Sequence, residues 1–306
     1  MKLLVVNPNT TAGMTARIGE AARAAAAPAT EIVAVNPLSG PVSIEGYFDE
    51  AFAVPGMLEE ILKGQAAGAD AYVIACFDDT GLEAARCCAT GPVIGIGEAA
   101  FHLASLVAHR FSVVTTLSRS IAPIEANLVK YGLISRCARV RACEVPVLAL
   151  DDPASGARAK LSAEIDRAKA QDGADAIVLG CAGMADLAAA LAREHGLPVI
   201  DGVAAAVKLA EALVGLGHAT SKLGPYARPI AKPFAGIFAK LSACGANMRL
   251  RPPLLARRFR SRPPHRPSRR RLAPRFPAAA GPLRDVRENA GPRESGPRPP
   301  PSRTSR

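Results

Sequence analysis

Aromatic residues are scarce in this chain. Of its 306 residues none is Trp, and Phe, Trp and Tyr together make up only 4%. Ala, Val, Leu and Ile are plentiful instead, and this balance favours a helix-rich α/β protein over a β-sandwich. The length is ample for one large or two modest domains with a sizeable core.

Long apolar runs are missing as well. No stretch reaches the roughly 18 consecutive apolar residues of a membrane-spanning helix. The first ten residues, MKLLVVNPNT, hold too short an apolar run for a secretory signal peptide. We therefore expect a cytoplasmic protein that does not associate with membranes.

The cysteine spacings typical of metal and redox sites are also absent. The seven cysteines include no CxxC pair, so zinc binding and thioredoxin-type chemistry have little support. The odd count argues against a disulfide framework, and a cytoplasmic location predicts reduced thiols. The segment GIGEAA at 95–100 has only a fragment of a phosphate-binding loop. We expect neither a metal nor a cofactor.

Lysine is absent from residues 249–306, which are strongly basic through arginine, whereas the rest of the chain is slightly acidic. Residues 249–306 hold 17 Arg and 3 acidic residues, a net charge of +14. The remaining residues hold 21 basic and 24 acidic side chains, a net charge of −3. Rich in Pro and poor in large apolar residues, the tail 245–306 is predicted to be disordered. We do not expect it to bind nucleic acid, because it has no RNA-binding motif or repeated stacking aromatics.

Short apolar runs of strand length recur along the body of the chain and alternate with helical stretches. The predicted strands are 3–6, 31–35, 71–75, 92–96, 111–115, 176–180 and 198–201. The predicted helices are 13–27, 51–67, 81–89, 98–109, 118–131, 159–172, 184–195 and 203–216. This alternation is typical of βαβ units around a parallel sheet that is buried on both faces.

One stretch of the chain occurs twice. GADAYVIAC occupies residues 68–76 and GADAIVLGC residues 173–181, with six of the nine positions identical. A second pair, KLLVVN and RFSVVT, is offset by 108 residues, against 105 for the first. The nearly constant offset predicts two pseudo-symmetric, Rossmann-like α/β domains with parallel sheets and a cleft between them. We expect the first domain to hold residues 1–98 plus about 206–240, and the second to hold 99–205.

Both copies of the repeat end on a cysteine. In parallel α/β sheets ligands bind beyond the carboxyl ends of the strands, and Cys76 and Cys181 both fall there, each before a predicted helix. Free N–H groups at a helix start lower the pKa of a nearby thiol. The segment from Thr80 to Glu83 has the sequence of a capping box, and Asp79 is also expected to cap this helix. Two similar halves that face each other would place the thiols on opposite walls of the cleft.

A thiol on each wall suits the inversion of a carbon centre by proton transfer. One thiolate removes a proton from one face, and the opposite thiol delivers a proton to the other. No metal or cofactor is needed if hydrogen-bond donors stabilise the enolate-like state. The expected donors are the backbone N–H groups of Phe77, Asp78, Ala182 and Gly183. A single cysteine at a strand end is more often a core residue, but the matched placement favours a functional pair.

Further candidates lie at the ends of equivalent strands. Asn9 belongs to the NPNT segment after the first strand, and Thr115 and Thr116 end the matching strand of the second half. We expect all three to contact substrate, although turn formation and capping would also explain them. Ile44 is expected to line the pocket, whereas Glu45 is predicted to lie on the loop surface.

Longer motifs around these residues carry a family resemblance. VNPNTTAGMT, YVIACFDDTGLEAAR, FSVVTTLSRS, IVLGCAGMADL and GLPVIDGVAAAVKLAEAL follow one another along the chain. Together they resemble the hydantoin racemases of the aspartate/glutamate racemase superfamily over roughly residues 1–240. The resemblance implies a two-domain α/β fold, a cofactor-independent two-cysteine mechanism and a homo-oligomer. It also places Cys76 and Cys181 on the family's catalytic positions.

The residues after each cysteine point to the substrate class. Glutamate racemases resemble this pattern but carry Asn-Thr and Thr-His after their cysteines, which hold a zwitterion. Here FDD follows Cys76 and AGM follows Cys181. A neutral cyclic ureide fits better, and the resemblance implies a 5-monosubstituted hydantoin that loses its C5 proton. Phe77 and Met184 are placed to border an apolar C5 substituent.

Other functions stay open on the sequence alone. Allantoin racemase shares the ring and the two-cysteine chemistry, and differs in a polar ureido substituent. The missing Asn-Thr and Thr-His pairs argue against an amino-acid racemase. The presence of both thiols argues against a decarboxylase, which would need only one working cysteine. A two-lobed protein that binds a small ligand without converting it is the alternative from another class.

Overall fold

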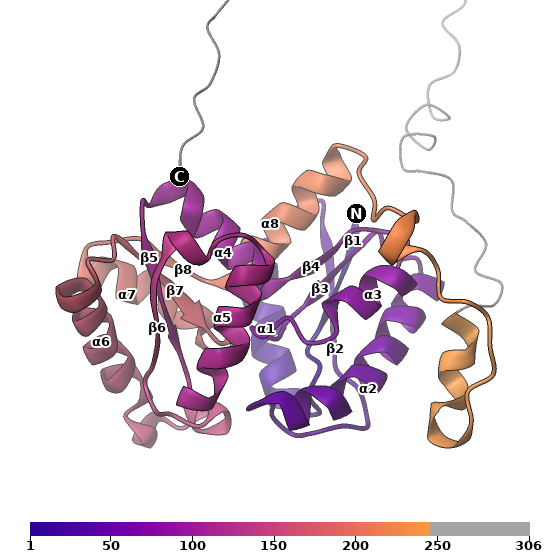
Figure 1. Ribbon diagram of the computed structural model, residues 1–306, viewed down its shortest axis with the longest axis horizontal. Helices are drawn as coiled ribbons and strands as arrows, with labels where there is room; N and C mark the ends of the chain where they lie inside the picture. The colour runs from indigo at the N-terminus through magenta and orange to yellow at the C-terminus, as the bar shows by residue number, and fades with distance from the viewer. Residues whose placement is uncertain (245–306) are drawn as a thin grey trace, which may run out of the picture. The chain divides into compact units, whose positions relative to one another are not determined.

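Two parallel sheets with the same strand order form the described part of the chain, residues 1–244 of this computed structural model (Figure 1). The first sheet has the order β2-β1-β3-β4 and the second has the order β6-β5-β7-β8. The predicted α/β class with two pseudo-symmetric parallel sheets is therefore confirmed. The prediction for the tail, 245–306, concerns residues outside the described part.

Seven of the eight strands in residues 1–244 match predicted ones. The first sheet holds β1 (Lys2–Val6), β2 (Glu31–Val35), β3 (Ala71–Ile74) and β4 (Val93–Gly95), and the second holds β5 (Phe111–Thr115), β6 (Cys137–Ala142), β7 (Ala176–Gly180) and β8 (Val199–Ile200). The sequence did not predict β6, because two arginines interrupt its apolar pattern. One of them, Arg141, is buried and forms ion pairs with Glu164 and Asp172.

Eight α-helices lie near the predicted positions in the described residues. They are α1 (Ala12–Ala25), α2 (Tyr47–Ala66), α3 (Leu82–Cys88), α4 (Ile96–Val107), α5 (Ile121–Lys130), α6 (Ala157–Arg167), α7 (Ala188–His195) and α8 (Gly202–Gly215). The helix predicted from residue 184 begins later, because a 3-10 helix occupies Ala182–Leu187 first. Within residues 1–244 no helix is both long and apolar enough to cross a membrane.

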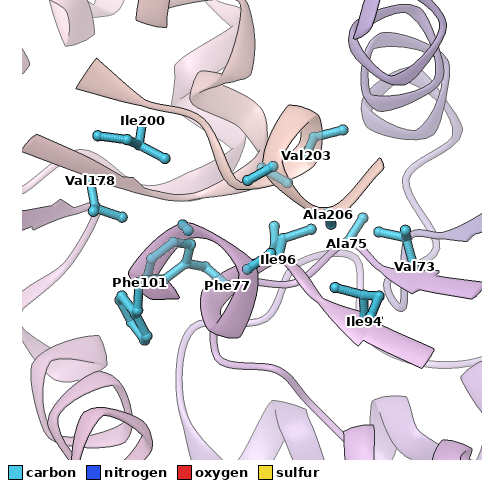
Figure 2. Packing of buried hydrophobic residues seen from close by; sticks show 14 of the residues in the cluster. Val73, Ala75, Phe77, Ile94, Ile96, Phe101, Val178, Ile200, Val203 and Ala206 are labelled. Atoms are coloured by element: carbon cyan, nitrogen blue, oxygen red, sulfur yellow. The ribbon is translucent and has the colours of Figure 1, made fainter. Parts of the chain in front are cut away.

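A shared core joins the two sheets. Side chains of a strand alternate between the two faces of its sheet, and Val5 of β1 and Val113 of β5 lie in the same buried cluster. Their neighbours Val6 and Val114 point to the opposite faces, into separate clusters. Figure 2 shows labelled members of the shared cluster from both halves, Val73, Ala75, Phe77, Val178 and Ile200, with Val203 and Ala206 of α8 among them.

The sequence repeat coincides with equivalent positions in the two sheets. Val5 pairs with Val73 in the first sheet, and Val113 pairs with Val178 in the second. These are the residues that the offsets of 108 and 105 relate in the sequence. The segments that follow β3 and β7 therefore leave their sheets at equivalent points. The predicted domain boundaries themselves stay a prediction.

Candidate active site

A cavity lies where the carboxyl ends of the central strands of both sheets come together. Cys76 comes two residues after β3 and Cys181 directly after β7, and both line this cavity. Each is partly buried, and neither is in a disulfide. Cys88 is disulfide-bonded, contrary to the expectation that all the thiols are reduced. The fold thus brings the two repeated cysteines to one cavity, while their catalytic role stays a prediction.

Nine of the ten predicted site residues line this cavity. They are Asn9, Ile44, Cys76, Phe77, Asp78, Thr115, Thr116, Cys181 and Ala182. Gly183 is the exception, because it lines a different groove with residues of α1, α7 and α8. The 3-10 helix that starts directly after Cys181 turns the chain at this point.

The two side chains predicted to border the C5 substituent pack in the hydrophobic core. The Phe77 ring packs edge-on against Phe101 of α4, with 5.4 Å between the ring centroids (Figure 2). Met184 is fully buried in the cluster on the far face of the second sheet. Met184 does not line the cavity, so the prediction that it borders the substrate was wrong. Phe77 also lines the cavity, so its contact with the substrate stays a prediction.

Seven lining residues were not predicted from the sequence. They are Asn7, Pro8, Met14, Ala75, Ser120, Val147 and Gly180. Asn7 could have been predicted from the sequence, because it is the first residue of the NPNT segment. Its side-chain amide donates to Asn9 Oδ1 at 2.9 Å and to Thr15 Oγ1 at 3.0 Å. Ser120 ends the FSVVTTLSRS motif, whereas Val147 begins a 3-10 helix in a segment without a motif, so only the fold shows that Val147 lines the cavity.

The surroundings of Cys76 raise its pKa. Burial and the nearby carboxylate of Asp78 raise the pKa of the thiol, and hydrogen bonds from the Thr80 hydroxyl and the Asp78 backbone N–H oppose this shift. The Thr80 oxygen lies 3.3 Å from the sulfur. The predicted capping box is wrong, because α3 begins at Leu82 without a side-chain cap. The prediction that a helix start lowers the pKa of this thiol is contradicted with it.

Comparison with known proteins identifies the family. Residues 3–210 match the family described as Asp/Glu/Hydantoin racemase. The chain belongs to the Asp/Glu/Hydantoin racemase family. The resemblance seen in the sequence motifs is thereby confirmed.

Named relatives of this racemase cover most of its described part. Hydantoin racemase of Rhizobium meliloti is 54% identical over 236 residues, which are 77% of this chain and 98% of that protein. Hydantoin racemase of Pseudomonas sp. (strain NS671) is 49% identical over 237 residues, 77% of this chain and 95% of that protein. A solved allantoin racemase from Klebsiella pneumoniae has a TM-score of 0.78 and 53% identity, and the match covers 79% of this chain and 98% of that one. These matches show a racemase, and the substrates in the names of these relatives differ.

Only three ionisable side chains line the cavity of this racemase within the described residues, Cys76, Asp78 and Cys181. The lining includes no His, Lys or Arg, so a Cys–His hydrolase has no support. His195 is buried elsewhere, where its ring nitrogens lie 3.0 Å from Ser162 Oγ and Asp166 Oδ1. The candidate proton donors and acceptors among these lining side chains are therefore the two thiols and the Asp78 carboxyl group.

The carboxyl group of Asp78 has a raised pKa. Burial, with the charges of Glu50 and Asp79, raises its pKa to about 7. Near neutral pH it is partly protonated, which removes part of the negative charge beside Cys76. The loop that carries it is tied to α5, because Asn127 Nδ2 donates to the Asp78 carbonyl oxygen at 2.8 Å.

Cys181 has a different setting from Cys76. Its backbone is extended, with φ −155° and ψ 138°, and it directly precedes a 3-10 helix. Its carbonyl oxygen accepts a hydrogen bond from the Met184 N–H at 3.1 Å. The strand beside it ends on Thr115, whose hydroxyl donates to the Gly180 carbonyl oxygen at 3.0 Å. The Thr115 hydroxyl is thus used, at least in part, to fasten the two strand ends.

Glu45 links the two halves beside the cavity. Its Oε1 accepts a hydrogen bond from the Val147 N–H at 2.8 Å, and its own N–H donates to Asp49 Oδ2 at 3.0 Å. The adjacent Ile44 lines the cavity, as does Val147 itself. The prediction that Glu45 is loop surface was wrong, because its carboxylate accepts a hydrogen bond from a donor that lies 102 residues away in the sequence.

Proposed function

We propose that this racemase inverts C5 of 5-monosubstituted hydantoins by proton transfer between Cys76 and Cys181, without a cofactor. The observation that supports this most is that two cysteines at equivalent ends of β3 and β7, neither of them in a disulfide, line one cavity. The hydantoin racemases that match over nearly their whole length support the ring as substrate.

The proposed reaction moves two protons and needs no other reactant. One cysteine thiolate takes the C5 proton, so a C–H bond breaks and an S–H bond forms. The electron pair left on C5 spreads onto the adjacent ring carbonyl as an enolate. The opposite thiol then gives its proton to the other face of C5 and becomes a thiolate. For the other enantiomer the two cysteines exchange roles, so they titrate as a coupled pair.

Backbone groups are the proposed stabilisers of the enolate. Phe77 and Ala182 follow the two cysteines and line the cavity, and their N–H groups suit a developing oxyanion. The Asp78 N–H is bonded to the Cys76 sulfur, so we assign it to the thiolate rather than to the substrate. Asn9 and Thr116 are proposed to hydrogen-bond the ring.

Allantoin is the second candidate substrate. The solved allantoin racemase is about as similar to this chain as the first of the hydantoin racemases, at 53% against 54% identity. Polar side chains such as Asn7 and Ser120 line the cavity. They favour a polar group on C5 over a bulky apolar one.

The test follows optical rotation of L-5-methylhydantoin, L-5-benzylhydantoin and allantoin in deuterated buffer, each against an enzyme-free control. We expect at least one hydantoin to lose its rotation with deuterium entering C5, and the relative rates to rank the substituents. Loss of rotation with allantoin alone would replace the hydantoin assignment. No change with any of the rings would remove the proposal.

Two substitutions test the thiols. Cys76→Ser and Cys181→Ser should each lower the racemisation rate by about a thousandfold or more, because a serine hydroxyl is a far weaker acid and base at neutral pH. Cys137→Ser is the matched control, since Cys137 is a partly buried free thiol on β6 that does not line the cavity. A Cys76 or Cys181 variant with the control's rate would contradict the two-thiol mechanism.

We also infer that the enzyme is a cytoplasmic homo-oligomer. The sequence resemblance supports the assembly, and the lack of membrane-spanning apolar runs in the sequence supports the location. Light scattering of the purified protein measures its mass, and a monomer of 31.7 kDa would contradict the assembly.

A further inference from the structure

The carboxylate of Asp79 lies at the start of a helix to which it does not belong. Its Oδ1 accepts the Gly97 N–H at 2.9 Å, and its Oδ2 accepts the Glu98 N–H at 2.8 Å. These are first-turn N–H groups of α4, which have no partner inside their helix. The Tyr131 hydroxyl donates to Oδ2 at 2.8 Å. The Asp79 residue is buried, with 6% of its surface exposed.

Two glycines make this approach possible. A Cβ atom at Gly95 would lie 2.1 Å from Asp79 Oδ1, and one at Gly97 would lie 3.0 Å from Oδ2 and 2.3 Å from the Phe77 carbonyl oxygen. Any side chain there would displace the loop after β3. The GIGEAA segment, which resembles part of a phosphate-binding loop, therefore holds an internal carboxylate in the place of a phosphate.

The second half caps its equivalent helix locally. α8 follows β8 as α4 follows β4, and its N-cap residue is Asp201. The Asp201 carboxylate accepts the Val203 and Ala204 N–H groups at 2.9 and 2.8 Å, which is the usual pattern of an N-cap. In the first half the N-cap position is Gly95, which has no side chain to offer. The cap of α4 comes instead from the loop that carries Cys76.

Asp79 is also bonded to Cys76 within that loop. Its backbone N–H donates to the Cys76 carbonyl oxygen at 3.1 Å. Its φ is +51°, a conformation that non-glycine residues rarely adopt. The docked carboxylate therefore holds a turn that the chain does not favour by itself, and the position of Cys76 depends on that turn.

We propose that Asp79 is a positioning residue, which fixes Cys76 opposite Cys181 by docking its carboxylate on the first turn of α4. The proposal rests on the proposed two-thiol reaction. α4 packs against β7 and α5 as well as against β4. The hydrogen bonds from the Gly97 and Glu98 N–H groups to the Asp79 carboxylate, called the dock below, therefore connect the Cys76 loop to elements of both halves. A small displacement of a reacting group lowers the rate of the chemical step more than it lowers substrate binding.

The test compares Asp79→Asn with Asp201→Asn, which makes the same change, one carboxylate oxygen to an amide NH2 group, in the equivalent cap of α8. Both variants should unfold at a lower temperature than the parent, by similar amounts. Asp79→Asn should lower kcat at least about tenfold with KM nearly unchanged, whereas Asp201→Asn should keep kcat within about twofold. Equal kcat values in the two variants would show that Asp79 only caps a helix and would overturn the proposal.

A second readout does not depend on turnover. Iodoacetamide labelling, followed by mass spectrometry of the Cys76 and Cys181 peptides, gives the ratio of the two reaction rates. Asp79→Asn should change this ratio at least about threefold, and Asp201→Asn should leave it unchanged. Tyr131→Phe, which removes one donor and leaves the dock, should change it by less in the same direction. An unchanged ratio in both Asp79→Asn and Tyr131→Phe would overturn the proposal even if the substrate assignment fails.

Discussion

At the level of single residues, the surroundings of Cys76 and Cys181 differ. Cys76 has Asp78 beside it and receives hydrogen bonds from the Thr80 hydroxyl and the Asp78 N–H, while Cys181 stands directly before a 3-10 helix. The sequence predicted both positions, because a cysteine repeated at a fixed offset is visible without a structure. It did not predict the raised pKa of Cys76, because burial and the Glu50 charge come from the tertiary fold.

Removing the charge of Asp78 should make Cys76 easier to ionise. A carboxylate beside a thiol disfavours the thiolate, and above pH 7 the Asp78 carboxyl group is mostly ionised, since its pKa is about 7. In Asp78→Asn the pKa of Cys76 should therefore fall. The rate of Cys76 alkylation by iodoacetamide should reach its half-maximum at a lower pH than in the parent.

The Cys181 peptide of the same sample is the internal control. Its alkylation profile should move less, because no pair of acidic residues follows Cys181 as Asp78 and Asp79 follow Cys76. A Cys76 profile that moves to higher pH, or that does not move, would contradict the inferred repulsion between the carboxylate and the thiolate.

At the level of elements, the loops after the strands determine the site and are the part that sequence patterns describe least well. Asp79 was expected to cap the helix after it, α3, but it caps α4. Glu45 was expected on the surface, but it binds the Val147 N–H. Helix starts and strand ends follow local residue preferences, whereas these two carboxylates bind partners that lie 18 to 102 residues away.

Loss of the Glu45 side chain should loosen the cavity. In Glu45→Ala the Val147 N–H loses its acceptor, and a hydrogen bond to a charged group contributes about 1.5–3 kcal/mol. Ile44 and Val147 line the cavity on either side of this bond, so substrate should be held less tightly. We expect KM to rise about threefold to tenfold and kcat to change less, in steady-state assays with the substrate that the rotation test selects.

Glu45→Gln separates the hydrogen bond from the charge, since its amide oxygen accepts from the same N–H. This variant should stay within about twofold of the parent KM. If Glu45→Ala and Glu45→Gln raise KM equally, the bond to Val147 does not close the cavity.

At the level of the whole molecule, the repeat predicted the two sheets and the shared cavity. Apolar periodicity located seven strands, and equivalent positions in the two halves pair in register, as Val5 with Val73 and Val113 with Val178 show. The missed strand, β6, carries Arg141, whose buried charge is neutralised by Glu164 and Asp172 from later in the chain. A pattern search cannot see such pairing, because it depends on which helix comes to cover the strand.

The division of charge along the chain gives a prediction for the complete molecule. The Rhizobium meliloti relative is matched over 98% of its length by 77% of this chain, and all residues that line the cavity lie between Asn7 and Ala182. A chain that ends at residue 244 should therefore keep the parent kcat and KM. It also loses the 17 Arg of residues 249–306, which leaves a net charge of −3.

The full chain, with its net charge of +11, should be retained on a heparin column and elute with salt, because basic residues bind a polyanion by charge alone. Such retention does not require the RNA-binding motif or stacking aromatics that the tail lacks. The shortened chain should pass through the same column, and its circular dichroism spectrum should show that it is folded. Retention of the shortened chain would place the basic surface in the body rather than in the tail. A folded but inactive shortened chain would show that the tail takes part in catalysis. This would contradict the prediction that residues 1–244 are sufficient for activity.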